Sequence, residues 1–168
     1  SRGLGDVYKR QATTGSVFDE ISRVLKTQSV TPSIKFINQF YDQKSFIDSW
    51  EEKLSSFDVV DYDHILFSYH GLPTKAVDDI YDDSLCSDND CENRITEENK
   101  FCYKATCYET TRLIAERFNL PSEKYTVSFQ SRLTKNWIEP FTDGCSRNYQ
   151  KKVSRIFSFC LLLLQLIT

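Results

Sequence analysis

Residues 65–73, ILFSYHGLP, carry the clearest structural signal in the sequence. Its first five residues form an apolar run without alternation, which is typical of a strand buried on both faces of a parallel sheet. Gly71 and Pro73 then force a turn. Ligands bind beyond the carboxyl ends of the strands in open α/β sheets, so His70, just past the end of this run, is a candidate functional residue.

Segments with helical and strand patterns alternate on both sides of this stretch. Phe46, Ile47, Trp50 and Leu54 share one face of a predicted helix. The complete set of expected elements is helices over about 16–25, 43–55 and 103–118, and strands over 33–40, 65–69 and 125–130. This order predicts an α/β protein with a doubly wound, mostly parallel sheet.

Composition limits the function classes. The chain has 168 residues, 40% of them hydrophobic, so it can form a packed core of one domain or of pieces of two. Its net charge of −3 argues against binding of nucleic acid, which needs a basic surface. The longest apolar stretch, residues 156–167, is shorter than the ~20 residues that span a bilayer.

Both ends of the chain are unusual. The sequence contains no Met, and residues 1–11 show neither periodicity nor the apolar stretch of a secretory signal, so we interpret them as a non-native leader. The region after Asp143 has two interpretations. It forms a helix followed by a buried strand, or it departs from the natural sequence.

The chain contains two histidines, at the two ends of the apolar run. A neutral imidazole at the position of His70 can accept a proton or bind a metal ion. The plain alternative is that His70 only hydrogen-bonds its turn. We expect His64, at the start of the run, to be structural.

Four cysteines form a C-x4-C-x10-C-x4-C pattern in and just after an acidic loop: Cys86, Cys91, Cys102 and Cys107. Four thiolates so close in sequence suit tetrahedral zinc or an iron–sulfur cluster. Free or disulfide-forming thiols are the weaker alternative, because nothing at the N-terminus indicates secretion. The remaining cysteines, Cys145 and Cys160, lie after Asp143 and are assigned no role.

Four blocks in order carry a resemblance to a known family. They are FYD with FI at residues 40–47, ILFSYHGLP at 65–73, CYETT at 107–111, and FQSR with W, P, T and D at 129–143. Together they resemble the ferrochelatases, which insert ferrous iron into a porphyrin at the end of haem synthesis. The cysteine loop is similar to an internal insert of certain bacterial members.

The resemblance implies a fold of two flavodoxin-like domains with a porphyrin cleft between them, of which this chain holds a part. Residues 12–58 would end the first domain. Residues 59–143 would form the first half of the second, with the cysteine loop at 74–107. Residues 144–168 remain a doubtful tail that matches no family block.

The resemblance also implies roles for individual residues. His70 matches the histidine that accepts pyrrole protons, binds the incoming iron, or both. Gln130, Ser131 and Trp137 match residues near the porphyrin, although Trp137 by residue type alone suits a core position. The four cysteines would hold a two-iron two-sulfur cluster in preference to zinc.

The expected function is therefore insertion of ferrous iron into protoporphyrin IX or coproporphyrin III. The family's carboxylate-bearing segment is expected after Asp143 and is not found there, so we expect this chain alone to be inactive. The alternatives are a related tetrapyrrole chelatase for another metal and a non-enzymatic iron–sulfur or zinc-binding domain. We expect a cytoplasmic protein with a peripheral membrane contact and no nucleic-acid partner. The oligomeric state is left open.

Overall fold

The computed structural model describes residues 12–30, 32–35, 37 and 39–161. The chain divides into two units, one with the residues up to Phe40 and one spanning Tyr41–Leu163. The predicted leader at 1–11 and the end of the predicted tail at 162–168 lie outside the described residues.

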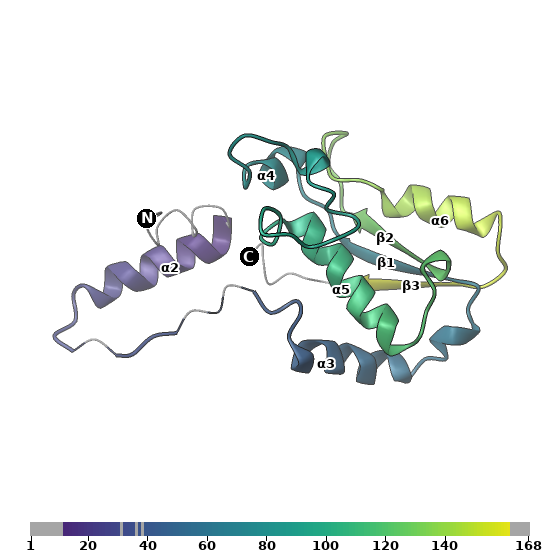
Figure 1. The fold of residues 1–168 in the computed structure, drawn as a ribbon, viewed down its shortest axis with the longest axis horizontal. Helices are drawn as coiled ribbons and strands as arrows, with labels where there is room; N and C mark the ends of the chain where they lie inside the picture. The colour runs from purple at the N-terminus through teal and green to yellow at the C-terminus, as the bar shows by residue number, and fades with distance from the viewer. Residues whose placement is uncertain (1–11, 31, 36, 38, 162–168) are drawn as a thin grey trace. The chain divides into compact units, whose positions relative to one another are not determined.

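The first unit contains helix α2, Ala12–Leu25, which confirms the helix predicted there (Figure 1). The strand predicted over residues 33–40 is wrong, because the described residues of that range are irregular. A strand needs a neighbouring strand for its backbone hydrogen bonds, and the described part of this unit offers only a helix.

The second unit is built on a parallel sheet of three strands, which are β1 (His64–His70), β2 (Tyr125–Gln130) and β3 (Ile156–Leu161). Their spatial order is β2-β1-β3, and both pairings of β1 are parallel. Six of the seven residues of β1 are buried, as its apolar run predicts. The α/β architecture with a parallel sheet is confirmed.

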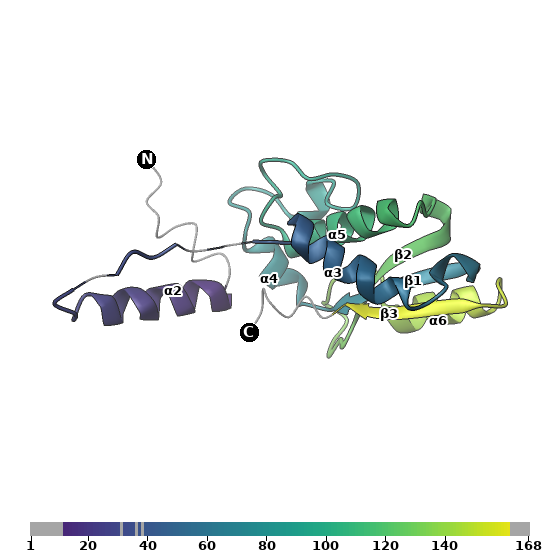
Figure 2. The same ribbon diagram turned by 90° about the horizontal axis from the view of Figure 1, so that it is seen from below.

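Helices cover both faces of this sheet. Figure 2 shows α3 (Lys44–Ser55) and α5 (Tyr103–Arg117) on one face and α6 (Thr142–Gln150) on the other. The sheet is therefore doubly wound. Because β2 and β3 lie on opposite sides of β1, the direction of winding reverses between β1 and β3. Open α/β sheets bind ligands at the carboxyl edge near such a reversal.

Short elements complete the unit. They are helix α4 (Thr74–Asp78) and the 3-10 turns η1 (Val59–Asp61), η2 (Cys86–Asp88) and η3 (Ser122–Lys124). Helix α5 ends where the sequence predicted, because Asn119 adopts a left-handed φ of 51°. Among the described residues, no helix is both long enough and apolar enough to cross a membrane.

The core of the unit lies between the helices and the sheet. Phe67, Tyr69, Ile114 and Phe129 are almost completely buried there. Of the two interpretations of the region after Asp143, the helix and the strand are both formed, since β3 pairs with β1 along its length. The other interpretation, a departure from the natural sequence after Asp143, stays a prediction.

Candidate functional site

The candidate site lies at the carboxyl edge of the sheet. His70 ends β1 and pairs with Gln130, which ends β2. The imidazole of His70 is partly exposed, and among the described residues no side chain is hydrogen-bonded to it. Ser131 follows with a φ of 64°, a left-handed conformation that turns the chain sharply away from the sheet. The structure thus brings three predicted site residues to one edge.

Gly71 allows a close approach at this edge. Its N–H donates to the carbonyl oxygen of Gln130 at 2.7 Å. A Cβ added to Gly71 would lie 2.6 Å from that oxygen and 3.2 Å from Cε3 of Trp137. Only a residue without a side chain lets the turn after β1 lie against both neighbours.

Trp137 is attached to the turn after β1 by backbone hydrogen bonds. Pro73 and Trp137 form an antiparallel bridge. Hydrogen bonds flank it on both sides: the N–H of Thr74 donates to the carbonyl of Asn136, and the N–H of Ile138 donates to the carbonyl of Leu72, both at 2.9 Å. The indole is only partly buried. Trp137 therefore lies beside His70-Gly71 and leaves part of its ring open to a ligand.

Tyr103 is a residue that the sequence patterns did not single out. Its hydroxyl donates to the backbone carbonyl of His70 at 2.8 Å. Burial raises the pKa of this hydroxyl well above its usual value, so it remains a donor. The only sequence signal was its position directly after Cys102, at the start of a predicted helix.

His64 has very different surroundings at the opposite end of β1. Its ring stacks on that of Tyr149 with centroids 3.6 Å apart, and its Nε2 lies 3.0 Å from the hydroxyl oxygen of Thr126. Only 2% of the residue is exposed, and this burial lowers the pKa of the imidazole. These are the surroundings of a structural histidine, as its position predicts.

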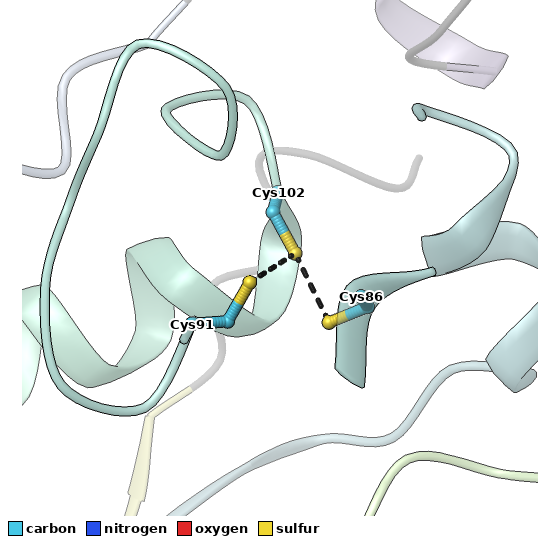
Figure 3. Close-up of side chains that lie close together, drawn as sticks. All are labelled: Cys86, Cys91 and Cys102. Carbon is cyan, nitrogen blue, oxygen red and sulfur yellow. Dashed lines mark hydrogen bonds between the residues drawn. The ribbon is translucent and has the colours of Figure 1, made fainter. Parts of the chain in front are cut away.

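Three of the four patterned cysteines converge in a second cluster (Figure 3). The Sγ of Cys102 lies 3.5 Å from that of Cys86 and 3.7 Å from that of Cys91. All three sulfur atoms lie within 4.8 Å of one another, and all three residues are buried. Cys107 is also buried but is not part of this group, and its thiol interacts with Tyr103.

A single buried amide orders the loop that carries the cluster. Asn99 is fully buried, and its Nδ2 donates to the carbonyls of Asn89 and Arg94, each at 2.9 Å. The backbone carbonyl of Asn99 accepts the backbone N–H of Cys102 at 2.7 Å. Asn99, another residue that sequence analysis missed, thus places the third sulfur opposite the first two.

The electrostatics of the cluster favour a thiolate at Cys102 beside protonated thiols at Cys86 and Cys91. Hydrogen bonds from the thiols of Cys86 and Cys91 lower the pKa of Cys102, which also lies at the N-terminus of α5. The pKa of Cys86 is raised in turn. Three buried sulfur donors at these distances fit zinc or an iron–sulfur cluster, which both take thiolate ligands.

The comparisons with known proteins agree with this architecture. The family model of ferrochelatase matches residues 8–161. The chain belongs to the ferrochelatase family. The match begins inside the predicted leader and runs through α6 and β3, so it includes most of the region interpreted as a doubtful tail. The predicted domain boundaries at 12–58 and 59–143 stay predictions.

Curated ferrochelatases of several bacteria are similar to the chain. The protein of Legionella pneumophila (strain Corby) is 39% identical over 133 residues, which cover 79% of this chain and 39% of the relative. That of Pseudomonas fluorescens (strain Pf0-1) is 34% identical over 94% of this chain and 48% of the relative. That of Coxiella burnetii (strain Dugway 5J108-111) is 34% identical over 89% and 42%. The chain thus spans less than half the length of these relatives.

Proposed function

We propose that this chain forms part of a ferrochelatase, which inserts ferrous iron into protoporphyrin IX or coproporphyrin III in haem synthesis. The observation that carries the proposal is His70, a partly exposed imidazole at the carboxyl end of the central strand and at the point where the winding of the sheet reverses. Together with family membership, this position favours a catalytic histidine.

The chemistry that we assign to His70 is proton acceptance. As the metal enters the macrocycle, two pyrrole N–H bonds break, their electron pairs bind the iron, and two protons must leave. A neutral imidazole can take one of these protons and release it to water, and the other passes to water directly. The same nitrogen can hold ferrous iron, the substrate metal, before insertion.

Gln130, Ser131 and Trp137 are proposed to bind the porphyrin. Trp137 offers a flat apolar surface of the kind that a macrocycle stacks on. Gln130 and Ser131 offer polar groups for a propionate or a rim atom. The proposal is supported by the contact of Gly71 with both Gln130 and Trp137, since that contact holds these residues at one edge with His70.

The cysteine cluster is proposed to hold a two-iron two-sulfur cluster, with zinc as the rival. Cys86, Cys91 and Cys102 supply three sulfur ligands, and Cys107 is the proposed fourth, which must move toward the others to bind. When bound, such a cluster supplies a redox-active or purely structural crosslink. The protein residues contribute the buried pocket, and Asn99 orients its loop.

The cofactor proposal is tested by the absorption spectrum and by the iron, sulfide and zinc content of anaerobically purified protein. A visible spectrum with matching iron and sulfide supports the cluster, and a colourless protein with stoichiometric zinc contradicts it. Cys91→Ser and Cys107→Ser are expected to lose the group. Cys145→Ser is the matched control, because Cys145 is half-buried on α6 outside the cluster.

The activity is tested by an anaerobic insertion assay with both porphyrins and with competing divalent metals. We expect the complete gene product to insert ferrous iron and this chain alone to show no turnover. Preference for another metal or tetrapyrrole would favour a related chelatase. A complete protein that binds the metal group but inserts no metal would favour a non-enzymatic metal-binding domain.

The cellular setting is part of the same proposal. We infer a cytoplasmic protein that touches the membrane peripherally to collect its hydrophobic porphyrin. Its net charge of −3 supports the absence of a nucleic-acid partner. Cell fractionation of the complete protein, with and without a high-salt wash of the membranes, tests this part.

A further inference from the structure

One short path connects the cysteine cluster with the candidate catalytic residue. The sulfur of Cys102 contacts both other sulfurs of the cluster, and Tyr103 is the next residue along the chain. The hydroxyl of Tyr103 donates to the carbonyl oxygen of His70 at 2.8 Å. A single side chain thus joins the start of α5 to the end of β1.

Tyr103 is fixed by its packing, so a displacement of its backbone moves the whole side chain. Only 7% of it is exposed, and its ring packs against Phe129 with centroids 6.4 Å apart. Its own carbonyl accepts the hydroxyl of Thr106 at 2.9 Å. Because the ring is packed in the core, a movement of Cys102 is passed to the hydroxyl instead of being absorbed by rotation of the side chain.

The hydroxyl contacts the strand where the sheet ends. The N–H of Gly71 donates to the carbonyl of Gln130 at 2.7 Å. The carbonyl of His70, which belongs to the same peptide group, accepts the hydroxyl of Tyr103. These two hydrogen bonds fix the peptide group that follows the imidazole. The orientation of His70 therefore depends on the position of α5 as well as on the sheet.

We propose that Tyr103 is a positioning residue that couples metal occupancy of the cysteine site to the orientation of His70. Without metal, Cys86 and Cys91 meet Cys102 only through weak thiol contacts. Metal–sulfur bonds replace these contacts, fix Cys102, and thereby fix the start of α5. Tyr103 carries this constraint to the His70 carbonyl. The coupling rests on the proposed metal site, and only its catalytic meaning rests on the proposed iron insertion.

The coupling is measurable in the present chain without porphyrin. Only two histidines exist, and His64 is 2% exposed, so diethyl pyrocarbonate modification followed by peptide mass spectrometry reports on His70. We compare the chain loaded with Zn²⁺ and the chain treated with a chelator. The expected result is a change of about fivefold in the modification rate of His70, at the lower end of common coupling strengths.

Two tyrosine variants isolate the path. Tyr103→Phe removes the hydroxyl and is expected to bind zinc as the native chain does while losing most of the zinc-dependent change. Tyr108→Phe is the matched control, since Tyr108 lies on the same helix and is partly buried without a hydrogen bond to His70 among the described contacts. This control is expected to retain the full change.

A measurement on the native chain covers the case in which Tyr103→Phe fails to fold. Zinc is expected to slow hydrogen exchange of the Gly71 amide, which is bonded to Gln130 next to the His70 carbonyl. Equal modification and exchange rates with and without zinc overturn the inference, as does a full zinc effect in Tyr103→Phe or failure of the chain to bind zinc. None of these outcomes bears on iron insertion, which the assay of the complete protein decides separately.

Discussion

The two histidines of this chain lie at opposite ends of one strand and have opposite surroundings. His64, at the amino end of β1, is buried, stacks on Tyr149 and contacts Thr126. His70, at the carboxyl end, is partly exposed, and its backbone carbonyl is bonded to Tyr103. The side chains are chemically identical and are separated by the length of one strand.

The surroundings at each end of the strand determine what its histidine can do. At the amino end, α6 folds back over the sheet and encloses the ring of His64. At the carboxyl end, the chain turns away at Gly71 and Ser131 and leaves the ring of His70 accessible. An enclosed imidazole stabilises the fold, whereas an accessible one can exchange protons. The four predictions below test this contrast, beginning with the largest expected effect.

Replacing each histidine by alanine should separate activity from stability. In the complete protein, His70→Ala is expected to lower kcat by about 10²–10⁴-fold, the usual contribution of a positioned proton acceptor. His64→Ala is expected to retain kcat but to lose about 1–3 kcal/mol of unfolding free energy, because it leaves a cavity and removes one of the two side-chain contacts of the Thr126 hydroxyl. Insertion kinetics and urea unfolding measure the two effects. Undiminished insertion by His70→Ala would contradict a catalytic histidine.

A methyl group at Gly71 should disrupt the carboxyl end specifically. Because its Cβ would lie 2.6 Å from the Gln130 carbonyl, Gly71→Ala forces the turn off β2. We expect a loss of about 1–3 kcal/mol in unfolding free energy. Gly144→Ala, a glycine of α6 with open space around it, is the control and should be neutral or stabilising by about 0.5–1 kcal/mol. Equal effects of both variants would show that the close approach is unimportant.

Removing the ring of Tyr149 should weaken the amino end. Tyr149→Ala deletes the stack on His64 and the 2.9 Å contact with the Thr126 hydroxyl. The expected loss is about 1–2 kcal/mol of unfolding free energy. Tyr149→Phe keeps the stack and should cost only about 1 kcal/mol for the lost hydrogen bond. Unchanged stability of Tyr149→Ala would mean that α6 does not enclose His64 in solution.

The smallest expected effect is the pH dependence that His64 contributes to stability. Burial lowers its pKa in the folded state, so the unfolded chain takes up the proton first as the pH falls. The contribution is constant above the unfolded value of about 6.5, and stability is lost as the pH falls below it. Urea unfolding between neutral and mildly acidic pH should show this loss in the native chain and less of it in His64→Gln. Parallel curves would contradict the prediction.

Local patterns predicted most elements of the second unit. The uninterrupted apolar run of β1 and the helical spacing before Asn119 reflect burial of whole faces, which is written into neighbouring residues. The prediction of a strand over residues 33–40 was wrong because a strand also depends on residues far away in the chain. Its composition suits a strand, yet pairing requires a partner that no local pattern guarantees.

The candidate sites also have a part that local sequence predicts and a part that depends on distant partners. Cysteine spacing identified the thiols, but only the folded loop shows that three sulfur atoms converge and that Cys107 is outside the group. Asn99 carried no recognisable signal and Tyr103 only its place after Cys102, because a buried amide and a buried hydroxyl look like ordinary loop and helix residues until their partners are known.

Sequence patterns were thus enough to identify the family, the central strand and His70 as a candidate, since motif spacing and hydrophobic runs are properties of residues close together in the chain. Only the folded structure shows which residues enclose His64, which sulfur atoms meet, and that Tyr103 reaches His70 across 33 positions. Such contacts depend on how distant segments pack, and packing is a property of the whole core.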